Sequence, residues 1–260
     1  MSTELVVISK ESNGIAIVTL NDSANRNAMS EAMSESFAAR VSDLRKDSAI
    51  RVVVLRGAGG AFSGGGHMEM LTAKPKLSAP ENRRLMELFY ENFLSICSLE
   101  VPVIAAINGH AIGAGLCVAL SCDIRIAVDT AKLGLNFVLL GLHPGMGATY
   151  FVPRLIGSAR AAELLYTGKS ITAQYAAQVG LVNETVPAND FEATVSTTAD
   201  AIAAAGPETV RELKLSLRNS HTLSLEECLR REAECQARSY TGKEFLEGIS
   251  AATEKRKPKF

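Results

Sequence analysis

The most restrictive feature of the chain is the alternation of short apolar runs with helical segments between residues 50 and 140. Three runs are rich in branched side chains: RVVVLRG at 51–57, VPVIAAING at 101–109 and DIRIAV at 123–128. Runs that are apolar on both faces are typical of parallel strands covered by helices. Because strands that alternate with helices form right-handed βαβ crossovers, the pattern predicts an α/β fold with a mostly parallel sheet.

The flanking segments extend this prediction. Residues 4–22 are typical of a hairpin that turns at Asn13-Gly14, and residues 30–46 and 81–98 have helical spacing. Beyond Pro144 the pattern becomes helical, at 145–156, 158–167, 172–178, 190–205, 207–218, 224–239 and 242–255. Ser158, Thr172 and Ser224 are predicted helix N-caps. A break near 200–206 divides the chain into a core of residues 1–200 and a helical C-terminal region of residues 201–260.

Composition excludes several classes of protein. A net charge of -1 without a basic stripe argues against a nucleic-acid partner. The sequence has no secretion signal and no apolar run of the ~18–20 residues that a membrane span needs. Five scattered cysteines without a C-x-x-C pair predict free thiols rather than disulfides or a metal site. We therefore expect a cytoplasmic protein with no membrane partner and no metal.

Three glycine-rich turns are the candidate functional elements: AGGAFSGGGHMEML at 58–71, NGHAIGAGL at 108–116 and GLHPGMGAT at 141–149. Glycine lets backbone N–H groups approach a ligand closely, and two such groups aimed at one point form an oxyanion hole. Glycine also simply permits tight strand-to-helix turns, so each turn alone has both interpretations. The patterns of a P-loop, a dinucleotide-binding turn and a nucleophile elbow are absent from the sequence.

Nearly the whole chain resembles the crotonase (enoyl-CoA hydratase/isomerase) superfamily. The resemblance is carried by NRNAMSEAM, AFSGGGHMEML, VPVIAAINGHAIGAGLCVALSCDIRIA, GLHPGMGATYFVPRLIG, AAELLYTGKSITAQYAAQVGLVNETV and FLEGISAATEKRKPKF, in that order. It implies a spiral of ββα units with a helical C-terminal trimerisation region, assembled as a homotrimer or a dimer of trimers. It also implies an acyl-CoA substrate and no cofactor beyond coenzyme A as the thioester carrier. Attachment of the acyl group to an acyl-carrier protein stays open.

The resemblance also implies roles for individual residues. Backbone N–H groups of Gly66 and Ala114 would stabilise a thioester enolate. The coenzyme would be held by Arg26, Asn27, Ala28, Phe62 and Gly64, with Lys255 reaching its phosphate from a neighbouring subunit.

Two positions depart from the hydratase pattern. Hydratases of this superfamily place and activate water with two glutamates, and the matching positions here are Cys117 and Phe137. We interpret Cys117 as a buried packing residue and expect Phe137 to keep its side of the pocket dry. The sequence therefore predicts an enzyme that is not an efficient hydratase, with decarboxylation or double-bond isomerisation favoured. The alternative is a catalytically silent acyl-CoA-binding homologue.

A second, partial resemblance points the same way. Decarboxylases of polyketide β-branching cassettes share the turn around Gly145 and also lack both glutamates. Their usual histidine in the C-terminal helix is Gln236 here, and Lys74 and Lys76 match their lysine only loosely. Double-bond isomerases that carry an acid in the same turn do not match, because that position is Gly145.

Histidines supply the remaining candidates for acid–base chemistry. His67 adjoins the first oxyanion donor, and His143 lies in the third glycine turn. Either side chain could transfer a proton near neutral pH. Each also has a structural interpretation, as a hydrogen-bonded residue of its turn.

Overall fold

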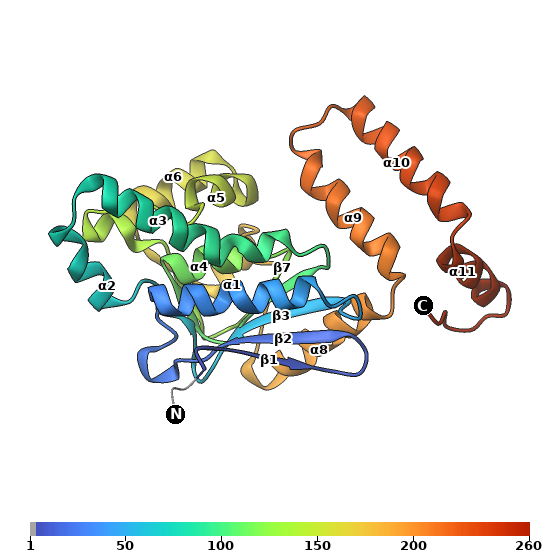
Figure 1. Cartoon of the computed structure of the whole chain (residues 1–260), viewed down its shortest axis with the longest axis horizontal. Coiled ribbons are helices and arrows are strands. Elements are labelled where there is room, and N and C mark those ends of the chain that lie inside the picture. Colours follow the sequence, from blue (N-terminus) through green and yellow to red (C-terminus); the bar gives the residue numbers. More distant parts are fainter. Residues whose placement is uncertain (1–3) are drawn as a thin grey trace.

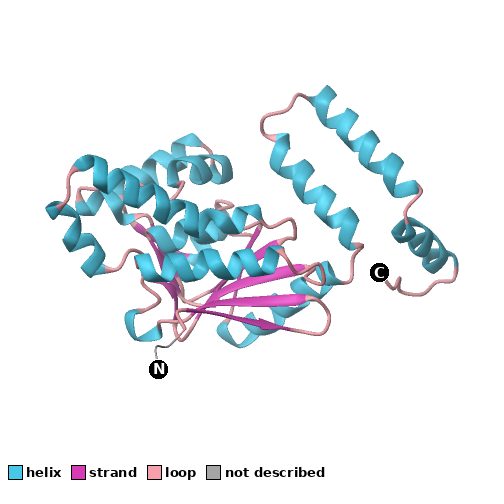
Figure 2. Ribbon diagram, viewed as in Figure 1, coloured by secondary structure: helices cyan, strands magenta, loops and turns pink. Residues whose placement is uncertain are grey.

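The computed structural model describes residues 4–260, which form a parallel sheet with helices on both faces (Figures 1 and 2). In the main sheet only β1 and β2 are antiparallel, as the Asn-Gly hairpin predicts, and the other neighbours are parallel. The apolar runs at 51–57, 101–109 and 123–128 contain its central strands, so the predicted α/β fold is confirmed. The strand order is β1 (Val6–Lys10), β2 (Ile15–Leu20), β3 (Val52–Gly57), β5 (Val103–Ile107), β7 (Ile124–Val128) and β10 (Glu184–Val186).

A second, smaller sheet was not predicted from the sequence. Its strands are three residues each, in the order β4 (Ala61–Ser63), β6 (His110–Ile112), β8 (Lys132–Gly134) and β9 (Ser170–Thr172). Strands β4 and β6 lie within the first and second glycine turns and pair with each other in parallel. This small sheet therefore sets the two turns side by side.

The helices other than α2 and α4 agree with the predicted segments to within a few residues, apart from the last turn of segment 81–98, which is a 3-10 helix. Helices α2 and α4 were not among the predicted segments. They are α1 (Glu31–Arg45), α2 (Met68–Ala73), α3 (Ala79–Leu94), α4 (Ala114–Leu120), α5 (Ala148–Ile156), α6 (Ser158–Thr167), α7 (Ala173–Gln178), α8 (Ala188–Ala203), α9 (Pro207–Ser220), α10 (Leu225–Tyr240) and α11 (Lys243–Thr253). Short 3-10 segments are η1 (Ser23–Asn25), η2 (Lys74–Lys76), η3 (Ser95–Ser98) and η4 (Asn136–Leu140).

Two of the three predicted N-caps are confirmed. The Thr172 hydroxyl accepts a hydrogen bond from Tyr175 N at the start of α7, and Ser224 forms a capping box with Glu227 on α10. The prediction for Ser158 was wrong. Gly157 occupies the N-cap of α6, and Ser158 is already the first helical residue, without a side-chain cap.

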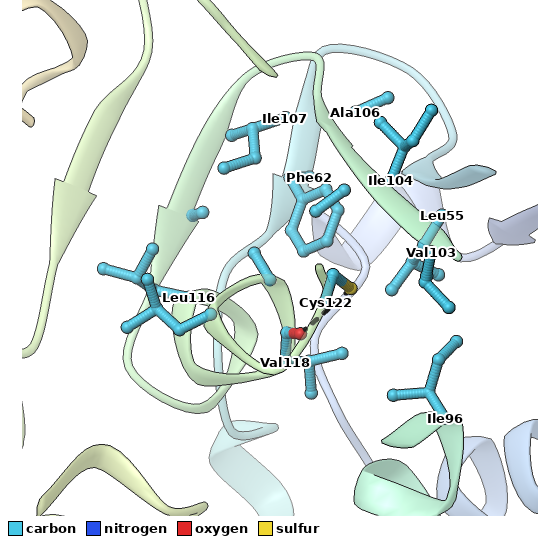
Figure 3. Packing of buried hydrophobic residues seen from close by; sticks show 14 of the residues in the cluster. Leu55, Phe62, Ile96, Val103, Ile104, Ala106, Ile107, Leu116, Val118 and Cys122 are labelled. Carbon is cyan, nitrogen blue, oxygen red and sulfur yellow. Dashed lines mark hydrogen bonds between the residues drawn. The ribbon is translucent and has the colours of Figure 1, made fainter. Parts of the chain in front are cut away.

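The hydrophobic core lies between the main sheet and the helices α1, α3 and α4. Figure 3 shows Phe62 and Leu116 packed with strand residues Leu55, Ile104 and Ile107. Because Phe62 comes from β4 and Leu116 from α4, the core holds the segments that carry the first two glycine turns.

The three C-terminal helices extend away from the core (Figure 1). Helix α9 is tied to it by the buried Lys214, whose Nζ donates to Val101 O at 2.8 Å and pairs with Asp123 at 2.8 Å. Many apolar side chains of this region are exposed: Leu213, Leu215, Leu217, Leu225, Leu229, Tyr240, Phe245, Leu246 and Ile249. Across residues 4–260, each helix falls short of the length and apolarity needed to cross a bilayer.

Candidate active site

The first and second glycine turns are in direct contact. Gly65 has a φ of +89°, and a methyl group built on its Cα would lie 2.7 Å from Ile112 O and 3.8 Å from Ala114 N. A methyl group on Gly115 would lie 2.5 Å from Ser63 Cβ. Since a side chain at Gly65 or Gly115 would push the two turns apart, close approach requires glycine at both positions, and at Gly65 the positive φ requires it as well.

The contact leaves two backbone donors unpaired. Gly66 pairs with Met29 in a parallel bridge in which Met29 N donates to Gly65 O and His67 N donates to Met29 O. The N–H of Gly66 therefore points away from Met29. Ala114 is the first residue of α4, where the N–H has no partner one turn earlier. Within the described residues neither N–H donates a hydrogen bond. Such free donors in adjoining turns suit an anion that develops on a bound thioester.

The loop predicted to hold coenzyme A packs against the first turn. Arg26 and Asn27 both have a φ of 54°, and Gly64 N donates to Arg26 O at 2.8 Å. The Asn27 side chain is buried and donates to Ala58 O and Ala61 O, which fixes the loop to β4. Its amide is therefore used internally, whereas the Arg26 side chain is exposed and Ala28 is half-buried.

The other residues predicted to contact the coenzyme differ in exposure and in position. Gly64 is exposed beside the loop, but the ring of Phe62 lies in the hydrophobic core, so only its backbone can reach a ligand (Figure 3). Lys255 lies two residues beyond the end of α11, and Figure 1 shows α11 on the opposite side of the molecule from α2. A single chain does not bring Lys255 to the Arg26–Ala28 loop.

The side chains that follow the second turn are not acids. Cys117 is fully buried, its Sγ donates to Gly145 O at 3.7 Å, and burial raises the pKa of its thiol. Phe137 lies beside the turn, with its Cζ 3.9 Å from a methyl group built on Gly113. The Asn136 Oδ1 is 3.5 Å from that same point, so an amide group borders the aromatic ring. No sequence motif singles out Asn136.

His67 lies directly after the first donor and serves as the N-cap of α2. Its Nδ1 accepts a hydrogen bond from Glu69 N at 3.3 Å, so Nε2 is the ring nitrogen that the cap does not use. The half-buried ring lines an open cavity of about 510 Å³, together with Ser30 and Glu31 from the start of α1. Lys74 also borders the cavity, and its Nζ pairs with Glu31 at 3.0 Å.

The third glycine turn contains His143 and Gly145, and Tyr90 from α3 packs against it. His143 is exposed, and its Nδ1 lies 2.8 Å from Pro144 O. A methyl group on Gly145 would overlap the hydroxyl of Tyr90, which comes from α3. Cys117 contacts the same glycine, so Tyr90 lies next to the first turn of α4. No sequence motif singles out Tyr90, because its proximity to Gly145 exists only in the folded chain.

Comparisons with known proteins show what the chain and its fold are similar to. The family model described as enoyl-CoA hydratase/isomerase matches residues 10–260. The protein YngF of Bacillus subtilis is 34% identical over 253 residues, which cover 97% of this chain and 96% of that protein. A crotonyl-CoA hydratase of Syntrophomonas wolfei is 32% identical, with 100% and 99% covered. The crystal structure of an enoyl-CoA hydratase from Bacillus anthracis superposes with a TM-score of 0.92 at 33% identity and covers 98% of each chain.

Proposed function

The chain belongs to the enoyl-CoA hydratase/isomerase family, and on that premise we propose that it transforms an acyl-CoA through a thioester enolate held by the N–H groups of Gly66 and Ala114. The single observation that supports the proposal is the contact between the first two glycine turns, where both N–H groups lack an internal acceptor. Two preorganised donors aimed at a developing oxyanion are worth several kcal/mol in such sites, roughly 3–4 kcal/mol for each donor.

The reaction we propose is decarboxylation or double-bond migration rather than efficient hydration. Addition of water needs groups that orient it and carry its protons. Cys117 is buried with its pKa raised by burial, and Phe137 is a hydrocarbon ring, so neither can do this at neutral pH. The relatives named as hydratases thus share the fold with this chain, and the chemistry would diverge at these two positions.

Assembly completes the proposed site. We propose a homotrimer or a dimer of trimers in which other subunits cover the exposed apolar side chains of α9–α11. Lys255, at the opposite end of the chain from α2, would then contact a coenzyme phosphate at a neighbouring subunit's Arg26–Ala28 loop.

The experiment that tests this function uses purified protein, heavy water and mass spectrometry. The substrates are crotonyl-, 3-enoyl-, glutaconyl- and methylmalonyl-CoA. Loss of CO2 or deuterium at the α or γ carbon would support enolate chemistry, whereas gain of water alone would contradict the proposed reaction class. Binding without any change of mass would favour the silent acyl-CoA binder.

Replacing Gly66 with proline tests the first donor. Proline has no N–H, so turnover is expected to fall by about 10²–10³-fold while acyl-CoA binding persists. Gly60→Ala is the matched control in the same segment, since a methyl group there meets nothing within 4 Å. Full turnover by a folded Gly66→Pro variant that binds substrate would remove this N–H from the mechanism.

A further inference from the structure

Tyr90 is a polar side chain next to the second and third glycine turns to which the proposed function assigns no role. It projects from α3 toward the third glycine turn, where its hydroxyl occupies the space that a side chain at Gly145 would need. Because even a methyl group at Gly145 would overlap the hydroxyl, glycine there is what admits the phenol. Gly145 has no positive φ, so this steric reason accounts for its identity without a backbone one.

The phenol is adjacent to the second oxyanion turn. Gly145 O accepts the hydrogen bond from Cys117 Sγ, so Tyr90, Gly145 and Cys117 form one continuous contact. Cys117 and Ala114 are three residues apart on α4 and therefore share a face of the helix. The Tyr90 hydroxyl thus lies beside the face of α4 whose first N–H is the proposed oxyanion donor.

The hydroxyl of Tyr90 is also free to contact a ligand. Tyr90 is half-buried, and within residues 4–260 its oxygen makes no hydrogen bond. Burial raises the pKa of Tyr90 above its usual value, and the neighbouring Cys117 adds to this effect. At neutral pH the side chain is therefore an O–H that can give a proton to a strong base and cannot remove one from a weak carbon acid.

On the premise that the proposed enolate chemistry holds, we propose that Tyr90 delivers the proton to the carbanionic carbon of the thioester enolate, and that this enolate forms by loss of CO2. The side chains found beside Gly113 and Gly145 are those of Asn136, Phe137, Tyr90 and Cys117, and none of them is a base at neutral pH. His143, two residues from Gly145, is exposed. The neighbours of the second and third glycine turns thus include an acid, Tyr90, and no base, which suits an enolate made by breaking a C–C bond.

The proposed steps balance without a further reactant. The C–C bond to the carboxylate breaks, CO2 leaves, and the electron pair stays on the thioester as an enolate facing the Gly66 and Ala114 N–H groups. The α carbon then forms a C–H bond with the phenolic proton, and the O–H bond of Tyr90 breaks. A solvent proton restores the phenol.

The test measures both rate and stereochemistry, with methylmalonyl-CoA and glutaconyl-CoA in heavy water as probes. Wild-type protein is expected to release CO2 and, from methylmalonyl-CoA, to place one deuterium on the α carbon of propionyl-CoA in a single configuration. Tyr90→Phe keeps the ring and removes only the oxygen. It is expected to lose about 10²-fold in rate, and its residual product should carry deuterium in both configurations because water then supplies the proton.

Two further variants keep the test decisive. Tyr175→Phe removes a hydroxyl from another half-buried tyrosine and should retain wild-type rate and configuration. Gly145→Ala displaces the Tyr90 hydroxyl without changing Tyr90 and should reproduce the loss of stereochemical control. Wild-type rate and a single configuration in a folded Tyr90→Phe variant would overturn the role of Tyr90.

The failure of this inference and that of the proposed function give different results. If wild-type protein exchanges deuterium into 3-enoyl-CoA but decarboxylates neither probe, the decarboxylation inference is wrong and the enolate function stands. If it changes no member of the panel, the enolate function itself fails.

Discussion

At the scale of single residues, Cys117 shows how burial decides chemistry. A thiol on the first turn of a helix beside a pocket is a candidate nucleophile when a cationic neighbour lowers its pKa. Here Cys117 is fully buried and donates to Gly145 O, and burial shifts its pKa upward instead. The thiol is therefore protonated throughout the neutral range, as the packing interpretation predicts.

Replacing Cys117 with alanine tests this interpretation. Turnover is expected to stay at the wild-type level, because the thiol carries no step of the proposed reaction. The free energy of unfolding should fall by about 1–2 kcal/mol, since the change deletes a fully buried heavy atom and leaves a small cavity. The two measurements are acyl-CoA turnover and urea unfolding.

Alkylation of the native protein provides the control. With iodoacetamide at neutral pH, the buried Cys117 and Cys122 should stay unmodified in the native protein and should react once the chain is unfolded. Rapid modification of Cys117 in folded protein, together with loss of turnover, would contradict the packing interpretation and indicate a catalytic thiol.

At the scale of elements, helix capping separates two residues that look equivalent in the sequence. Thr172 accepts a hydrogen bond from Tyr175 N at 3.2 Å, whereas Ser158 lies inside the first turn of α6 and caps nothing. Thr172→Ala is expected to lower the free energy of unfolding by about 1 kcal/mol. Ser158→Ala is the matched control and should be neutral or slightly stabilising. Urea unfolding of both variants measures the difference, and equal losses would contradict the assigned caps.

The elements also show what the sequence could and could not predict. Strands β3, β5 and β7 were predictable because each is a short segment rich in branched apolar residues. Strands β4 and β6 were not, because three residues are too few to show a period. Their pairing is nevertheless what sets Gly65 against Ala114 N.

Some residues of the candidate site could also be predicted from the sequence, whereas others could not. The glycine turns were recognisable from composition and family resemblance, which led to Gly66 and Ala114 before any geometry was known. Tyr90 lies 55 positions from Gly145, and only the packing of α3 against the third turn joins them. The sequence also could not show whether the side chain of Phe62 contacts a ligand or is buried, because its burial depends on the packing of the core (Figure 3).

At the scale of the whole molecule, the exposed apolar surface of α9–α11 implies association. These leucine, isoleucine and aromatic side chains are exposed to water in the single chain. Their burial against another subunit would stabilise an assembly, since each Å² of apolar surface removed from water contributes about 25 cal/mol of free energy. Light scattering of the purified chain is expected to give three or six times the subunit mass of 27.7 kDa. A monomer at micromolar concentration would contradict the proposed assembly and with it the shared coenzyme site.

In the proposed assembly, Lys255 would connect the oligomeric state to substrate binding. The residue is exposed, with a φ of 53°, just beyond α11, and the Arg26–Ala28 loop lies at the other end of the chain. If a neighbouring subunit supplies Lys255 to the coenzyme, Lys255→Ala should raise the KM for acyl-CoA several-fold and leave kcat unchanged, because a distant phosphate contact binds substrate and transition state equally. Lys257→Ala, two residues away on the same exposed tail, is the matched control and should leave both constants at wild-type values. Since a phosphate contact is electrostatic, the effect should also shrink at high salt. An unchanged KM in a Lys255→Ala variant of native mass would assign the coenzyme phosphate to other residues, whereas equal losses in both variants would point to the general charge of the tail.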